Sequence, residues 1–151
     1  MYKIIVAISE DGYIADINGN IPWHIPHDFK WFKMNTYNSS ILMGRKTWDT
    51  FKKPLHHRKN IVLSRGNTTC EQQIFSIKEA YDYFEDNDGW IIGGTIAENF
   101  YTKGTLIYLT HVHINVGKGT FLHLPNIKTI WKSKTFSHDS KFYTFSINII
   151  I

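Results

Sequence analysis

Hydrophobic residues occur along the chain in short runs that are rich in isoleucine and valine and end at glycine, proline, asparagine or aspartate. Such runs are typical of β-strands bounded by turns. Several runs show no alternation of polar and apolar positions, which indicates that both faces of the sheet are covered. The pattern predicts strands at residues 2–8, 40–43, 60–64, 90–94, 106–112 and 142–150.

Short segments with helical patterns lie between these strands. The alternation of strands and helices predicts an α/β fold with a central mixed sheet that is mostly parallel. Because the last two strands are joined without a helix, we expect the C-terminal edge of the sheet to be antiparallel. About four helices are expected to flank the sheet, at residues 26–36, 45–53, 77–86 and 95–102.

The connection formed by residues 9–24 is about sixteen residues long, which exceeds the usual loop length. We expect no strand or helix within it. Long loops of this kind often close over a binding site. The sequence therefore predicts that residues 9–24 form a lid.

Composition favours one domain and a reducing compartment. The chain has 151 residues, 42% of them hydrophobic, with no internal repeat or linker, so we expect a single domain over residues 1–151. The single cysteine, Cys70, cannot form an intramolecular disulfide. No apolar run approaches the ~20 residues that cross a bilayer, and the first residues lack a signal-peptide pattern. These features predict a cytoplasmic protein with no membrane partner.

The net charge of +4 favours anionic partners. Lys and Arg are spread along the chain, however, and no run is long enough to form a nucleic-acid arm. A phosphorylated small molecule accounts for this charge equally well.

The stretch IPWHIPHDF, residues 21–29, places the carboxylate of Asp28 among Ile, Pro, Trp and Phe. Pro26 suits the first helical position, so Asp28 falls in the first turn, where an acid complements the helix dipole. That purely structural role is one interpretation. In the other, Phe32 lies on the same helical face, four residues further on. A flat, nitrogen-rich ring would then stack on Phe32 and bind the carboxylate through two parallel hydrogen bonds.

Three other segments have the composition of phosphate-binding turns. MGRKTW (43–48) and IIGGT (91–95) each join a strand to a helix through glycine, which leaves backbone N–H groups free at the helix start. Each alone is as well explained by a tight structural turn. Together they indicate two helix N-termini on either side of one dinucleotide. LSRG (63–66) supplies Ser64 and an arginine, which would join Arg45 around a further phosphate.

His111 and His113 are two residues apart on an expected strand, so their side chains share one face. This spacing is compatible with a metal site. We see no third ligand on an adjacent motif, and we therefore predict no metal.

Taken together, the segments resemble one known family. The N-terminal strand with Ala7, then IPWHIPHDFKWFK, ILMGRKTWDTF, RKNIVLSR, IIGGT and IYLTH, occur in the order and spacing of dihydrofolate reductase over essentially the whole chain. The resemblance implies the fold of that family and reduction of 7,8-dihydrofolate to tetrahydrofolate by direct hydride transfer from NADPH. It also implies support of thymidylate synthesis and one-carbon metabolism. A monomer without a nucleic-acid partner is expected.

The resemblance implies a role for each substrate-side residue. Asp28 would contact the N3 and 2-amino group of the pterin and assist protonation of N5, with Thr110 supporting it through a hydrogen bond. Trp23 would anchor an ordered water beside it. Arg58 would clamp the α-carboxylate of the substrate. Backbone carbonyls are expected from Ile5 and Ile92, and apolar walls from Phe29, Phe32, Phe51 and Leu55.

On the cofactor side, the resemblance implies three groups of contacts. They are Ala7, Ile14 and Ile21 around the nicotinamide, Gly93, Gly94 and Thr95 near the pyrophosphate, and Arg45, Ser64 and Arg65 on the 2′-phosphate, with Gly44, Lys46 and Thr47 as further contacts. The chain departs from the family pattern at Ala15, His56-His57, Glu98 and Thr120. These departures bear on the lid and on cofactor affinity rather than on the fold.

Two other functions remain as alternatives. One is a related reductase acting on a pyrimidine of riboflavin synthesis, and the other is a non-catalytic basic module that binds nucleotides or nucleic acid. Asp28 and Arg58 match the pterin and the glutamate tail respectively, which favours the folate enzyme. A nucleic-acid module would show clustered basic residues with exposed aromatics between them.

Overall fold

Strands and helices alternate through the first two thirds of the chain, and strands alone follow. The computed structural model describes residues 1–151. Its helices are α1 (Pro26–Thr36), α2 (Arg45–Asp49), α3 (Ile77–Asp86) and the 3-10 helix η1 (Thr95–Phe100). Its strands are β1 (Tyr2–Ser9), β2 (Tyr13–Ala15), β3 (Ser40–Gly44), β4 (Lys59–Leu63), β5 (Gln72–Ile74), β6 (Gly89–Gly93), β7 (Leu106–Val112), β8 (Thr120–Phe121), β9 (Ile127–Lys132), β10 (Phe136–His138) and β11 (Lys141–Ile150).

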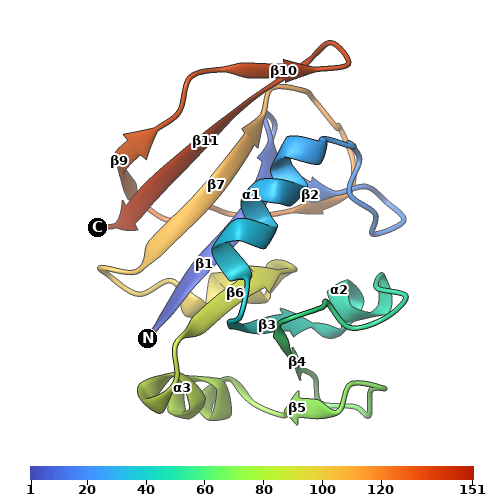
Figure 1. Cartoon of the computed structure of the whole chain (residues 1–151), viewed down its shortest axis with the longest axis vertical. Helices are drawn as coiled ribbons and strands as arrows, with labels where there is room; N and C mark the ends of the chain where they lie inside the picture. The colour runs from blue at the N-terminus through green and yellow to red at the C-terminus, as the bar shows by residue number, and fades with distance from the viewer.

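Nine of these strands form one twisted sheet (Figure 1) in the order β10-β11-β7-β1-β6-β3-β4-β5, with β9 also paired to β11. The pairings from β7 across to β5 are all parallel. Strand β11 runs antiparallel to β7, β9 and β10. The expected mixed sheet with an antiparallel C-terminal edge is therefore confirmed.

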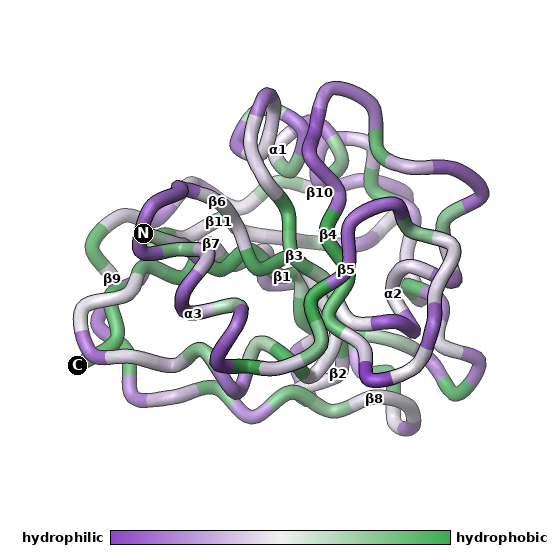
Figure 2. The backbone as a smooth tube through the Cα atoms, turned by 90° about the horizontal axis from the view of Figure 1, so that it is seen from below, coloured by the Kyte–Doolittle hydropathy of each residue, from purple (hydrophilic) through white to green (hydrophobic).

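The sheet is covered on both faces, and alternate residues of β1 divide between two hydrophobic clusters. Ile4 and Val6 pack in the larger cluster, which contains Phe84 of α3 and Phe100 of η1. Ile5 faces the opposite side and packs with residues of α1 and α2. Figure 1 shows α1 crossing one face of the sheet, and Figure 2 shows hydrophobic positions concentrated in the central strands. Two covered faces explain the continuous apolar runs in the sequence.

Two of the four expected helices have the predicted bounds, 26–36 and 77–86. The helix expected at 45–53 ends at Asp49, because the N–H groups of Thr50 and Phe51 bond to carbonyls only three residues back and tighten the last turn. The helix expected at 95–102 is the 3-10 helix η1, which ends at Phe100. Those two expectations were right in position but wrong in length.

The expectation that 9–24 contains no element is wrong. Strand β2 lies within it and pairs with β8 in a separate two-stranded sheet. At this junction a Cβ on Gly119 would collide with the carbonyl oxygen of Ala15, so only glycine allows the approach. The Asp11 carboxylate also accepts hydrogen bonds from the N–H groups of Val116 and Gly117. Residues 9–24 are thus tied to the segment 116–121, about a hundred residues away.

Candidate active site

Asp28 lies in the first turn of α1, as the sequence predicts. The helix begins at Pro26 and has no side-chain cap at Ile25, which is fully buried and extended. This start directs the carboxylate toward β7, where the Thr110 hydroxyl donates a hydrogen bond of 2.5 Å to Oδ1 of Asp28. Thr110 is 1% exposed. The predicted partnership of Asp28 and Thr110 is present in the fold.

Burial dominates the electrostatics of Asp28. Loss of hydration raises its pKa from 3.8 to about 6, and the hydrogen bond from Thr110 offsets part of that rise. Burial also raises the pKa of Tyr143, with a smaller contribution from the charge of Asp28. Because Thr110 occupies Oδ1, a proton on Asp28 resides at Oδ2. The site thus holds a carboxyl group that titrates close to neutrality, which suits acid–base chemistry.

The apolar residues predicted around the substrate come together in one cluster. Ile5 of β1 is 3% exposed and belongs to this cluster with Trp48 and Trp90. Phe32, Phe51, Leu55 and Ile92 pack against it. Phe29 instead lies at the surface, 47% exposed, with its ring 5.4 Å from that of His24. Five of the six predicted apolar residues therefore belong to one cluster, and Phe29 lies outside it at the surface.

Trp23 is 6% exposed, and its indole Nε1 has no hydrogen-bond partner. A buried N–H without a partner is costly, so such a group normally binds water or a ligand. The role of Trp23 as the anchor of an ordered water stays a prediction, and its indole N–H is free to fill that role.

Arg58 has two buried guanidinium nitrogens, Nε and Nη1, without partners. Burial lowers its pKa, but an arginine remains cationic. Asn60 holds the preceding loop in place, because its side chain bonds both the N–H and the carbonyl of Leu55 and also the carbonyl of Arg58. The orphan nitrogens fit a planar carboxylate. Sequence reasoning missed Asn60, since one asparagine at the start of a strand carries no distinctive signal.

The two glycine turns of the predicted dinucleotide site meet in the fold. A Cβ on Gly93 would lie 3.1 Å from Oγ1 of Thr47, so the turn at 91–95 packs against the start of α2. Gly94 has a φ of +72°, a conformation that side chains rarely adopt. The two turns that the sequence assigned to one dinucleotide therefore lie side by side.

The basic residues predicted to bind the 2′-phosphate lie beside this turn. A Cβ on Gly66 would lie 3.5 Å from Nη1 of Arg45, which brings the loop at 64–66 against α2. Arg45 is exposed, with its Nε 3.6 Å from a carboxylate oxygen of Asp49. Lys46, Arg65 and Thr95 are also exposed, and Ser64 is half-buried. This end of the site is a solvated basic surface.

The three residues predicted around the nicotinamide lie in different surroundings. Ala7 packs against the cluster that contains Trp23, whereas Ile14 packs against the larger core cluster. Ile21 is 55% exposed. Two of them, Ile14 and Ile21, belong to the segment 9–24, so their positions depend on how that segment is held.

The expectation that His111 and His113 lack a third neighbouring ligand is wrong. The Glu10 carboxylate lies within hydrogen-bond distance of both rings. Glu10 directly follows β1, His111 lies in β7 and His113 directly follows β7, and no local sequence signal links them.

Comparison with known proteins decides the family. The family model described as dihydrofolate reductase matches residues 1–149. The chain belongs to the dihydrofolate reductase family. Two dihydrofolate reductases of Buchnera aphidicola are similar over almost their whole length. The one from subsp. Baizongia pistaciae is 34% identical over 99% of this chain and 95% of its own, and the one from subsp. Acyrthosiphon pisum is 38% identical over 98% and 97%.

The fold is that of the same family. A solved dihydrofolate reductase from Enterococcus faecalis, complexed with NADP(H) and RAB-propyl, superposes with a TM-score of 0.86. It covers 99% of this chain and 95% of that chain at 23% identity. No helix of this family member is both long and apolar enough to cross a membrane.

Proposed function

We propose that this dihydrofolate reductase family member reduces 7,8-dihydrofolate to 5,6,7,8-tetrahydrofolate with NADPH, and that Asp28 is its central acid. One observation carries the assignment of the acid. Asp28 is the carboxylate whose burial raises its pKa to about 6, while its Oδ1 accepts a hydrogen bond from Thr110. A group with this pKa exchanges protons near neutral pH, as a reduction that adds a proton to its substrate requires.

The substrate end of the site positions the ring and the tail separately. Oδ2 of Asp28 faces the ring nitrogen and the amino group of the pterin, so the bound ring satisfies the desolvated carboxylate. Ile5 and Ile92 present backbone carbonyls, and the walls are Phe29, Phe32, Phe51 and Leu55. The unpartnered Nε and Nη1 of Arg58 support a bidentate clamp on the α-carboxylate.

The residues of the cofactor end fit NADPH. The close approach of Gly93 to Thr47 and the positive φ of Gly94 support a backbone cradle for the pyrophosphate. Arg45 and Arg65 carry the positive charge that a 2′-phosphate requires, with Ser64 as a further donor. The remaining contacts in this proposal come from Ala7, Ile14, Ile21, Gly44, Lys46 and Thr95.

The chain itself contributes positioning, water exclusion and one proton. Bound NADPH supplies the hydride. The apolar cluster that includes Ile5 and contacts Phe32 excludes water from one side of the reacting rings. The segment 9–24, as the proposed lid, covers the other side of the rings. The indole N–H of Trp23 holds a water next to Asp28. The carboxyl of Asp28 holds the proton at Oδ2 and assists its delivery toward N5 of the substrate.

We also propose that the chain acts as one domain over residues 1–151, as a monomer in the cytoplasm, without a nucleic-acid partner. Dispersed Lys and Arg residues support the last point.

The direct test is oxidation of NADPH on addition of dihydrofolate, with NADH and the riboflavin-pathway pyrimidine in parallel reactions. We expect turnover with NADPH and dihydrofolate, and slower turnover with NADH because it lacks the 2′-phosphate. Turnover of the pyrimidine without turnover of dihydrofolate would contradict the proposal. Salt-sensitive binding of nucleic acid without NADPH oxidation would favour the basic binding module.

A further inference from the structure

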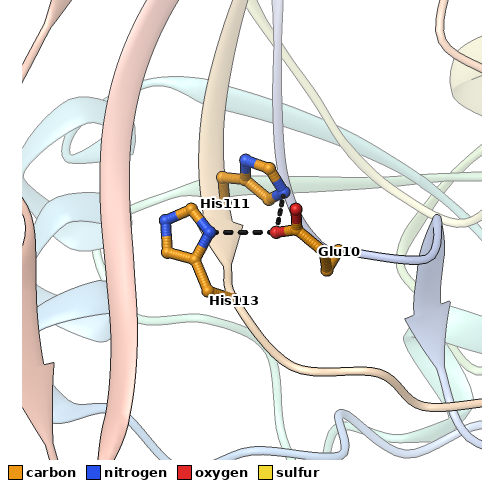
Figure 3. A group of neighbouring side chains, drawn as sticks. All are labelled: Glu10, His111 and His113. Carbon is orange, nitrogen blue, oxygen red and sulfur yellow. Dashed lines mark hydrogen bonds and ion pairs between the residues drawn. The ribbon is translucent and has the colours of Figure 1, made fainter.

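Two histidines and a carboxylate meet on the face of the sheet opposite to α1. Figure 3 shows the rings of His111 and His113 turned toward Glu10. Oε2 of Glu10 lies 3.0 Å from Nε2 of His111 and 2.9 Å from Nδ1 of His113. The three ligand atoms all lie within 4.8 Å of one another. The reductase activity proposed above uses none of these three residues.

The sheet, rather than a flexible loop, brings the group together. Strands β1 and β7 are parallel neighbours with Ser9 opposite Val112, so the next residues, Glu10 and His113, lie side by side. The N–H of Glu10 donates to the carbonyl of Ile114 at 2.9 Å, which continues the strand pairing by one residue. The backbone of all three residues is therefore fixed before any ligand binds.

We propose that Glu10, His111 and His113 form a binding site for a divalent transition-metal cation, with Zn²⁺ as the best fit. Two imidazole nitrogens and one carboxylate oxygen are ligands that zinc accepts, with water in the fourth position. Neighbouring ligands around tetrahedral zinc are about 3.3 Å apart. The observed separations of 2.9 and 3.0 Å need to open by only a few tenths of an ångström.

The surroundings orient one ligand and leave room for water. Nε2 of His113 lies 2.8 Å from Oγ1 of Thr144, which is 4% exposed. When Nε2 donates to this hydroxyl, Nδ1 presents its lone pair to the metal, as is common for metal-binding histidines. A cavity of about 550 Å³, lined partly by Glu10, His111 and Thr144, gives a cation and its water access to the site.

Two further charged side chains line the cavity beside the site, one acidic and one basic. The carboxylate of Asp11 also lines the cavity, but it is occupied by the N–H groups of Val116 and Gly117. Lys132 lines the same cavity and opposes a cation there. Replacing Lys132 with glutamine should therefore strengthen metal binding.

The test uses full-length protein without a histidine tag, stripped of metal with a chelator. Zn²⁺ is titrated in competition with a chromogenic chelator. We expect one equivalent bound with a micromolar or tighter Kd. Loss of a ligand in His111→Gln or His113→Gln should weaken binding about 100-fold, and loss of the orienting hydroxyl in Thr144→Val about 10-fold. Lys132→Gln should bind more tightly than the parent.

A second His–carboxylate pair provides the matched control. His123 lies at the surface with Nδ1 3.1 Å from Oε1 of Glu98, and no third ligand accompanies it. His123→Gln should leave the stoichiometry and the Kd of zinc binding unchanged. A Kd in the millimolar range for the parent, or an equal loss in His123→Gln and His111→Gln, would overturn the proposal.

A measurement on the unaltered protein guards against variants that fail to fold. Co²⁺ in a four-coordinate site with nitrogen ligands gives intense visible absorption bands, whereas six-coordinate Co²⁺ bound loosely at the surface gives weak ones. We expect the intense bands to saturate at one equivalent and to disappear on addition of Zn²⁺. Weak bands that do not saturate would overturn the proposal.

Discussion

The two ends of the proposed active site are built differently. At the substrate end, Asp28 is desolvated, accepts a hydrogen bond from Thr110 and lies beside a packed apolar cluster. At the cofactor end, Arg45 and Arg65 are exposed, and Arg45 has only a long ion pair with Asp49. The first end is preorganised by the core of the protein. The second is a solvated basic surface, and we expect it to become ordered only when a phosphate binds.

The largest effect should come from removing the charge at the preorganised end. Asp28→Asn keeps the shape of the side chain and its hydrogen bond from Thr110 but cannot exchange a proton. We expect hydride turnover to fall by about 10²- to 10⁴-fold near neutral pH, the usual contribution of a positioned acid or base. Single-turnover kinetics with NADPH measures this directly. Asp86→Asn, at the exposed end of α3, is the matched control, and an equal loss in both variants would refute the role of Asp28.

The exposed end should respond in cofactor affinity instead. Arg45→Gln removes a charge-assisted hydrogen bond to phosphate, which is worth about 1.5–3 kcal/mol, or about 10- to 100-fold in binding. We expect the KM for NADPH to rise by that factor while the KM for NADH and kcat change little. Lys128→Gln, on exposed β9, should change neither constant. An equal rise in the KM for NADPH and for NADH would mean that Arg45 does not bind the 2′-phosphate.

The buried carboxylate should also cost stability at neutral pH. The pKa of Asp28 rises from 3.8 unfolded to about 6 folded, so the folded state binds the proton more tightly. Tighter proton binding stabilises the folded state fully below about pH 4. This contribution is lost as the pH rises to about 6, and it is absent at higher pH. The shift corresponds to about 3 kcal/mol. In urea unfolding, Asp28→Asn should match the parent at about pH 4 and exceed its stability by up to that amount above about pH 7. Equal stability at both pH values would contradict the raised pKa.

The smallest expected effect concerns the turn that precedes Arg58. His57 has a φ of +57°, a left-handed conformation that favours glycine. His57→Gly should stabilise the protein by about 0.5–1 kcal/mol, because relief of strain exceeds the entropy that glycine loses on folding. His56→Gly has no such strain to relieve and should not stabilise. Thermal or urea unfolding of the two variants separates these outcomes.

The sequence predicted the parts of the molecule that are specified locally. Pro26 followed by Asp28 and Phe32 defines the start of α1 and one face of it without reference to other elements. Short apolar runs likewise located the six central strands, because strands covered on both faces carry a continuous apolar signal. The order of motifs then supplied the family resemblance.

Features that depend on distant pairing were missed or left undecided. Strand β9 is almost entirely exposed, so its sequence lacks apolar alternation. The pKa of Asp28 depends on burial, which raises it, and on the hydrogen bond from Thr110, which lowers it. The sequence could not weigh the two effects, because Thr110 is 82 residues away. The proximity of Glu10 to His113 follows from the register of β1 against β7, which no local pattern reveals. Pairings of this kind are fixed by tertiary packing rather than by local propensity.

The most direct test of the account is the titration of the Asp28 carboxyl in the ligand-free protein. Carbon-13 NMR of the side-chain carboxyl resonances, assigned by comparison with Asp28→Asn, gives its pKa without any assay of activity. We expect a pKa of about 6 for Asp28, because its carboxyl group is buried beside Thr110 of β7. A value near 3.8, that of a solvated aspartate, would contradict the central claim that this carboxyl is held out of water to handle a proton.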